Sequence, residues 1–190
     1  MNKKRIIALA FMAGLTWYWI ASRPVRFTEE VALSNGQVID VERVIKTSPV
    51  GEIGGPGGAY WKFNSIEVKS MAADAPSAPW TAPPNVMPIL IDRDAESGEW
   101  MVIASFITCQ AWFDAGRPLP AYLEYRWRGA WKSVPLSASS IGRPANLLVD
   151  ISASGEAERI PLFEKQTRMK DPTTYKPYTG ILSSHKTNCS

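Results

Sequence analysis

Few side chains in this sequence could perform chemistry together. His185 is the only histidine, and Cys109 and Cys189 are the only cysteines. A thiol nucleophile needs a base within hydrogen-bond reach, and Cys109 with His185 is the pairing of sulfur and imidazole that could supply it. Because His185 lies in a polar segment that nothing in the sequence holds in place, we predict no such dyad and name no catalytic residue.

The same scarcity argues against a metal centre, since a conventional catalytic zinc site takes three protein ligands drawn mainly from histidine, cysteine and carboxylate. One acidic run resembles a calcium-binding loop: Asp92, Asp94, Glu96 and Gly98. The glycine of an EF-hand loop is its sixth residue, however, whereas Gly98 would be the seventh. We interpret the run as a solvated hairpin turn, and we expect neither a metal nor another cofactor. A carboxylate-only site stays open, but the sequence singles out no pair.

Aromatic side chains are the remaining candidates for a binding site, because flat rings can stack on a glycan or a peptide. Most of them should form the core. Trp80 lies in a connection rich in proline and alanine, residues 72–84, and Tyr122 falls on the polar side of an alternating strand. We therefore expect these two rings to be exposed and name Trp80 and Tyr122 as candidate ligand-binding residues.

Cys109 and Cys189 are a candidate disulfide if the chain occupies an oxidising compartment. Closing a loop of about 80 residues would stabilise the fold by roughly 4 kcal/mol in the chain-entropy model. The alternative is that Cys109 is a buried free thiol and that Cys189 lies in a disordered segment.

The elements that would position these groups begin with a membrane-type segment. Three basic residues, Lys3 to Arg5, precede an uncharged apolar run from Ile6 to Ala21. As a helix this run would span roughly 24 Å, slightly less than the ~30 Å hydrocarbon core, so length does not distinguish an anchor from a signal peptide. A cleavage site needs a small residue at position −3, which Trp19 or Ile20 would occupy. We therefore favour an uncleaved anchor, residues 6–22, over secretion after cleavage.

The charges indicate the topology and the class of partner. The basic flank before the apolar run outweighs the one after it, which leaves the short N-terminus in the cytoplasm and the bulk of the chain outside it. Four of the 21 basic residues belong to these flanks, Lys3, Lys4, Arg5 and Arg23, which leaves 17 against 18 acidic residues. The exported part is nearly neutral. Because phosphate binding needs a clustered positive surface, we expect no nucleic-acid partner.

After the anchor, short apolar stretches alternate with turn signals, a pattern typical of an all-β domain. We predict an antiparallel β-sandwich or barrel-like meander of about seven or eight strands. It would occupy residues 24–165, after the anchor in residues 1–23. Residues 166–190 have no sustained apolar period and predict a polar tail that is loosely packed or extended.

The parity of the apolar residues predicts details of this domain. A three-residue loop, Ser34 to Gly36, keeps the apolar residues of the first hairpin on one face, with Gly36 in the left-handed conformation. A second such loop, Arg128 to Ala130, places Trp127 and Trp131 on the same face. The strand Trp100 to Ile107 is apolar at both parities and should be central.

The strand at residues 121–127 alternates, so we expect Leu123, Tyr125 and Trp127 to point inward and Glu124 and Arg126 outward. Residues 141–149 could form a helical turn or a strand, and the sequence does not decide between them.

Three segments carry a resemblance: GEWMV at 98–102, GRPLPAYLEYR at 116–126 and GRPANLL at 142–148. In them the chain resembles a group of uncharacterised bacterial proteins with an N-terminal membrane segment. The resemblance covers roughly residues 25–150. It implies a bacterial, Gram-negative setting, and it brings no activity with it.

These observations predict a non-enzymatic β domain that is tethered to the bacterial inner membrane through residues 6–22 and faces the periplasm. It would bind or scaffold an envelope component, a protein or a glycan. The alternative is an envelope hydrolase that uses carboxylates. An enzyme should show two convergent carboxylates in a pocket, whereas a binding domain should show exposed aromatic rings beside ordinary carboxylates.

Overall fold

The computed structural model describes residues 24–50, 58–69, 74–149, 159–171, 173, 178–187 and 189. The segment 6–22, for which we predict a membrane anchor, lies outside these residues. In the described part of the chain, no helix is long and apolar enough to cross a membrane.

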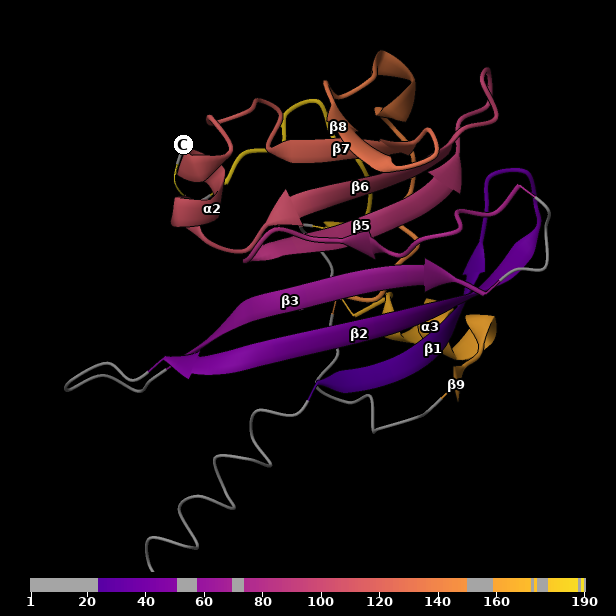
Figure 1. Ribbon diagram of the computed structural model, residues 1–190, viewed down its shortest axis with the longest axis horizontal. Helices are drawn as coiled ribbons and strands as arrows, with labels where there is room; N and C mark the ends of the chain where they lie inside the picture. The colour runs from indigo at the N-terminus through magenta and orange to yellow at the C-terminus, as the bar shows by residue number, and fades with distance from the viewer. Residues whose placement is uncertain are drawn as a thin grey trace, which may run out of the picture.

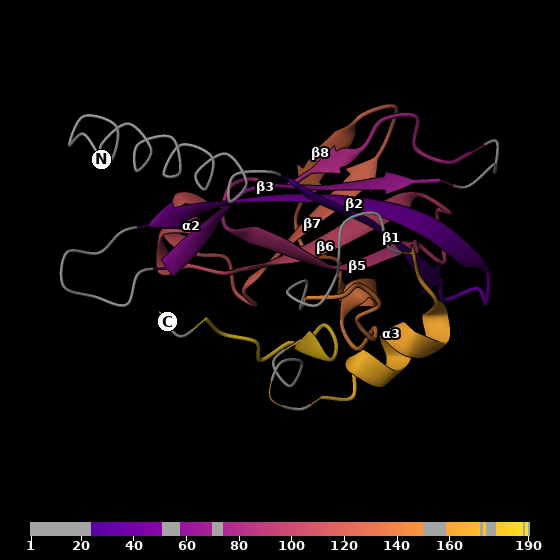
Figure 2. The same cartoon turned by 90° about the horizontal axis from the view of Figure 1, so that it is seen from below.

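The described residues form two β-sheets that pack against each other (Figures 1 and 2). Sheet A contains, in spatial order, β4 (Trp80–Thr81), β3 (Gly58–Val68), β2 (Val38–Val50), β1 (Val25–Ala32) and β9 (Arg159–Ile160). Sheet B contains β5 (Val86–Arg93), β6 (Trp100–Phe106), β7 (Tyr122–Trp127) and β8 (Trp131–Val134). All neighbours are antiparallel except β1 and β9, which are parallel. The prediction of a mainly β fold is confirmed, in a sandwich-like arrangement.

Among the described residues, two short helices lie between strands, α2 (Cys109–Asp114) and η1 (Ala138–Ser140), and a third, α3 (Leu162–Arg168), follows the last strand. Helix α3 packs against β1 at the side of sheet A (Figure 2). It crosses the boundary that we expected at residue 165, so the β domain and the following segment share an element.

The β1–β2 hairpin has the predicted three-residue loop. The Leu33 N–H donates to the Gln37 carbonyl at 2.8 Å, and Gly36 has a φ of +84°. Val31 then pairs with Ile39, so apolar side chains from both strands reach one face. That face is buried against sheet B. Both predictions about the Trp127–Trp131 hairpin are also confirmed, since the two residues are paired and their ring centroids lie 5.6 Å apart.

Strand β6 is central, as predicted, and all of its residues are buried. Val102 and Ala104 pack in the core cluster that includes Val41 of sheet A. Met101 and Ile103 point to the opposite face of sheet B and pack in a second cluster. Sheet B is therefore covered on both faces.

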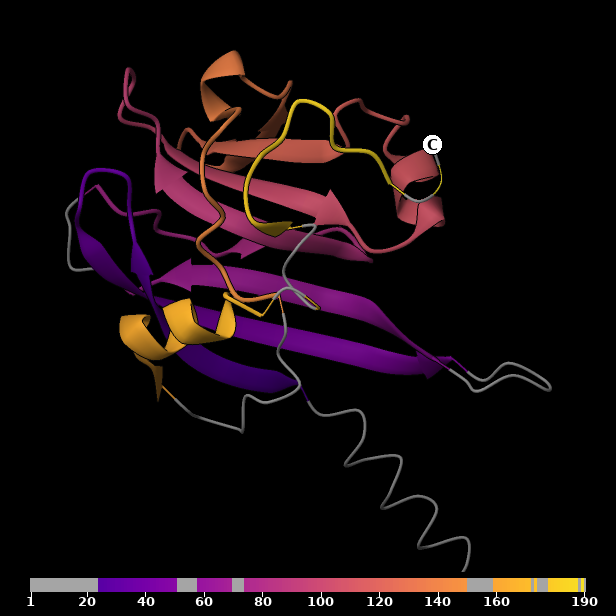
Figure 3. The ribbon, with the colours of Figure 1, turned by 180° about the vertical axis from the view of Figure 1, so that it is seen from behind.

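The cover on the outer face of sheet B consists of two irregular segments (Figure 3). One is residues 137–149. The other, which we call the strap, is residues 178–187 and 189. The two are joined by backbone hydrogen bonds from Gly142 to the Ile181 carbonyl at 2.7 Å and from Ile181 to the Arg143 carbonyl at 2.9 Å. Residues 141–149 are thus neither a helical turn nor a strand, apart from one isolated bridge at Pro144.

The predicted direction of β7 is confirmed on one face, because Leu123, Tyr125 and Trp127 pack against the core cluster between the two sheets. The expectation that the opposite face meets solvent is wrong, because Glu124 is fully buried beneath the cover. The alternation itself is right, because neighbouring side chains do point to opposite faces. The face that we took for solvent is the one that the later chain seals.

The strap is extended but not loosely packed. The Tyr122 hydroxyl donates to the Gly180 carbonyl at 3.2 Å and accepts from the Leu182 N–H at 3.2 Å. The Ala121 N–H donates to the His185 carbonyl at 3.1 Å. The start of β7 therefore holds the strap in place, although the sequence of the strap alone predicts no stable packing.

Candidate functional site

The two aromatic residues that we expected to be exposed are buried. Trp80 has 1% of its surface exposed and Tyr122 has 2%. Trp80 belongs to β4, where it pairs with Ile66, and its ring meets the edge of Tyr125 at 5.3 Å. Tyr122 lies beneath the strap. The prediction of exposed rings at these positions is wrong. The local composition around Trp80 and Tyr122 does not show that β4 packs against Tyr125 or that the strap covers Tyr122.

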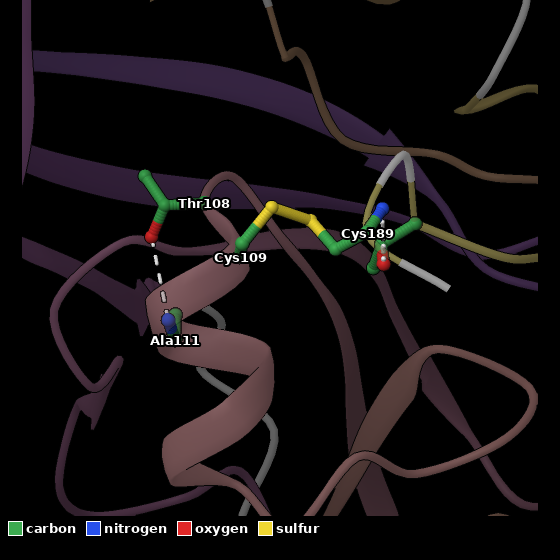
Figure 4. Close-up of a disulfide and its surroundings, with 5 residues drawn as sticks. Thr108, Cys109, Ala111 and Cys189 are labelled. Carbon is green, nitrogen blue, oxygen red and sulfur yellow. Dashed lines mark hydrogen bonds between the residues drawn. A yellow bond between two sulfur atoms is a disulfide. The ribbon is translucent and has the colours of Figure 1, made fainter.

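The two cysteines are joined in a disulfide, with their Cα atoms 5.5 Å apart (Figure 4). Cys109 is the first residue of α2, just after Thr108, whose hydroxyl caps the helix by accepting from the Ala111 N–H at 3.3 Å. The structure therefore contains the predicted disulfide and not the alternative, a free thiol at Cys109. With its sulfur bonded to Cys189, Cys109 cannot act as a thiol nucleophile.

A groove of about 430 Å³ opens between α2 and the β7–β8 end of sheet B. We call it the edge groove. It is lined by residues from four separate parts of the chain, which are Pro83, Pro84, Asn85, Val86, Gln110, Ala111, Asp114, Ala115, Leu123, Tyr125 and Ser133.

The walls of the edge groove are held by local structure. A turn closes where the Val86 N–H donates to the Pro83 carbonyl at 3.2 Å, with Asn85 in the left-handed conformation at a φ of 57°. On the opposite wall, the Gln110 amide donates to Asp114 at 2.6 Å. Burial raises the pKa of Tyr125, so its phenol keeps its proton at neutral pH. The groove thus combines an aromatic ring with amide, hydroxyl and carboxylate groups.

A second hollow of about 510 Å³ lies on the other face of the same edge. We call it the strap groove, because Ser183 of the strap contributes to it. Val134 lines the strap groove, whereas its neighbour Ser133 lines the edge groove. Successive residues of a strand point to opposite faces, so at β8 the two hollows lie on opposite faces of sheet B, and Leu123 of β7 lines both. Leu119 at the strap groove is 65% exposed.

The acidic turn after β5 is a structural element. Asp92 accepts from the Ser34 N–H at 3.0 Å and pairs with Arg143 at 3.0 Å. Asp94 accepts from the Ser97 N–H at 2.8 Å and pairs with Arg126 at 2.9 Å. The Ser97 N–H is the first cause that holds the pKa of Asp94 far below its ordinary value.

The turn itself, residues 95–98, is exposed and joins two strands, as expected. Asp92 and Asp94, which we took as part of the solvated run, are buried. The described residues contain no group of three or more metal-ligating side chains that could hold an ion.

A buried ionic cluster is the feature that our sequence reasoning missed. Glu29 bonds to Arg43 Nη1 at 2.7 Å and lies 3.3 Å from Lys165 Nζ, and all three side chains are buried. The Leu148 N–H donates to the same carboxylate at 3.2 Å. Burial is the main cause that lowers the pKa of Lys165. The signal was present in the sequence, because Glu29 and Arg43 occupy apolar positions of their alternating strands.

His185 does have a hydroxyl partner, which is Ser105. Ser105 Oγ lies 3.2 Å from His185 Nε2, and the imidazole stacks on Tyr122 with centroids 4.5 Å apart. Burial lowers the pKa of His185, so the ring is neutral at pH 7. Ser105 is almost fully buried, and its hydroxyl also reaches the Ala121 carbonyl at 3.4 Å. We interpret the pair as a fastening of the strap.

Comparison of this chain with protein-family models, with curated proteins and with solved structures finds no match.

Proposed function

We propose that the protein is a membrane-tethered, extracytoplasmic β domain that binds a component of the bacterial envelope, a protein or a glycan, in the edge groove. The observation that carries this proposal is the composition of that groove. Tyr125 and Leu123 provide apolar surface, and Gln110, Asp114 and Ser133 place polar groups around it. Binding sites typically combine an apolar lining with a few convergent polar groups.

The carboxylates support binding over the alternative of hydrolysis. The buried acidic side chains of the described residues are Glu29, Asp92, Asp94 and Glu124. Each bonds to an arginine within 3.0 Å. A general acid or base must exchange a proton with a substrate, and these carboxylates are instead buried and engaged by guanidinium groups. The edge groove contains one carboxylate, Asp114, where acid and base catalysis would need two.

The disulfide supports an extracytoplasmic location. Cys109 and Cys189 are bonded, and structural disulfides persist mainly in oxidising compartments. This agrees with the topology that we infer from the basic residues before the apolar run at 6–21.

The test is capture from solubilised envelope with the full chain as bait. Gln110→Trp should fill the edge groove and abolish the specific capture. Gln166→Trp is the matched control, since it makes the same change at an exposed position of α3. Mass spectrometry identifies what each bait retains, and circular dichroism verifies that both variants are folded.

The proposal fails if the folded Gln110→Trp variant captures the same components as the wild-type chain. It also fails if a captured substrate is cleaved by the wild-type protein and the cleavage depends on Asp114.

A further inference from the structure

The two edges of sheet B differ. The outer edge of β5 is occupied, because the Asn146 and Leu147 N–H groups donate to the Ile89 carbonyl at 3.0 and 3.1 Å. The Asn146 side-chain amide accepts from the Ile91 N–H at 3.0 Å and donates to the Ile91 carbonyl at 2.8 Å, as the backbone of a paired strand would. Strand β8 is the opposite edge, and in the described part of the chain its backbone is paired with β7 alone.

An open edge presents backbone groups to a partner. In an antiparallel pair, alternate residues of the outer strand direct their N–H and C=O groups away from the neighbouring strand. The natural complement of such an edge is another extended polypeptide, which adds itself to the sheet through main-chain hydrogen bonds. A glycan has no repeating amides at this spacing.

The hollows beside β8 match the side chains of an added strand. Ser133 lines the edge groove on one face, and Val134 lines the strap groove on the other. Successive side chains of an added strand would enter these two hollows in turn. Specificity at a strand-addition site arises in this way.

The charge at the edge selects among polypeptides. Lys132 of β8 is exposed and has no ion pair among the described residues. By alternation it shares the face of Val134 and the strap groove, whereas Asp114 belongs to the edge groove on the other face. An acidic side chain of the partner is favoured beside Lys132 and disfavoured beside Asp114.

We propose that β8 binds an extended, acidic segment of another envelope polypeptide by strand addition. The segment carries an apolar residue for the strap groove and, two positions away on the same face, a carboxylate for Lys132. A second copy of this chain is a poorer occupant, because β8 reads Trp131 to Val134 with no acidic residue. This inference rests on the proposed function and specifies the partner of the same site.

The experiment selects random heptapeptides displayed on phage against the full chain. We expect enrichment of sequences with an apolar residue two positions from a carboxylate. A synthetic peptide of the enriched sequence should bind Lys132→Glu about three- to tenfold more weakly than wild type, since an exposed attraction becomes a repulsion. Lys170→Glu is the matched control and should bind as wild type does. Replacing the peptide carboxylate with lysine should reverse the preference.

Backbone methylation distinguishes strand addition from side-chain docking. Two peptides are compared, one N-methylated at its odd-numbered residues and one at its even-numbered residues. Only one of these sets has N–H groups that face β8, so one of the two peptides should lose binding. The inference is overturned if both methylated peptides still bind, or if no peptide is enriched. Self-association of the wild-type chain that Lys132→Glu changes would also overturn it, in favour of a second copy.

The two proposals can fail separately. If Gln110→Trp removes capture of an envelope glycan and no peptide is enriched, the proposed function stands and strand addition is wrong. If Gln110→Trp leaves capture unchanged and no peptide is enriched, both are wrong.

Discussion

Replacing Glu29 with glutamine should destabilise the folded protein by about 3–5 kcal/mol, the cost of removing one partner from a buried ion pair. Glu29 is fully buried and contacts Arg43 at 2.7 Å and Lys165 at 3.3 Å. Without its charge, two buried cations lose the carboxylate that faces them. Glutamine has nearly the same volume, so the loss does not include the cost of a cavity.

The measurement is urea unfolding of the full chain in detergent micelles, followed by tryptophan fluorescence. The matched control is Glu67→Gln, whose side chain is 44% exposed and pairs with Lys69 at 2.7 Å. This control should change the free energy of unfolding by less than about 1 kcal/mol. The double variant Glu29→Gln with Lys165→Met should be more stable than Glu29→Gln alone, because one uncompensated cation is removed.

A Glu29→Gln variant that loses no more stability than Glu67→Gln would refute this reasoning. It would mean that water or an unrecognised anion already compensates Arg43 and Lys165. A double variant that is less stable than either single variant would show that Lys165 contributes by packing its apolar stem and not through its charge.

Three further outcomes are expected. Cys109→Ser should lower the free energy of unfolding by roughly 4 kcal/mol in the chain-entropy model, given a separation of 80 residues, as measured by urea unfolding. Folding lowers the pKa of Asp94, so the ionised side chain stabilises the folded state above pH 3.8, its ordinary pKa, and this stabilisation is lost progressively as the pH falls below that value. Asp94→Asn should therefore weaken the dependence of the free energy of unfolding on acid pH, measured by urea unfolding at a series of pH values. Trp127→Ala should cost about 2 kcal/mol by thermal unfolding, less than the ~3–5 of a fully buried ring, because Trp127 is only partly buried; a loss above about 4 kcal/mol would contradict this.

The parity of apolar residues predicted the strand pairing because it depends on local geometry. An odd loop at Ser34 to Gly36 keeps like residues together whatever the rest of the chain does. The same argument placed Trp127 opposite Trp131. These features need only a few neighbouring residues to specify them.

Parity did not predict which side of a sheet meets solvent. Glu124 looked like a surface residue of an alternating strand, but it is buried by two segments that lack any periodic pattern. Tyr122 was misjudged for the same reason. Irregular segments are held by specific hydrogen bonds to distant residues, and no local pattern announces such bonds.

The candidate site was beyond sequence reasoning for a related reason. The edge groove is lined by four separate segments, the first at Pro83 and the last at Ser133, and the order of the strands in the sheet brings them together. Glu29 and Arg43, by contrast, could have been found. A charged residue at an apolar position in each of two paired strands predicts a buried ion pair.

The strap also has a consequence for the export that we propose. The outer face of sheet B is sealed by residues that follow β7 by more than fifty positions, and Cys189 lies 80 residues after Cys109. A chain exported from its N-terminal side would therefore leave the face of sheet B that carries Met101 and Ile103 only partly covered until the strap has emerged and the disulfide has formed. In the export that we propose, the domain would need protection from aggregation during that interval, which would make the timing of disulfide formation part of its biogenesis.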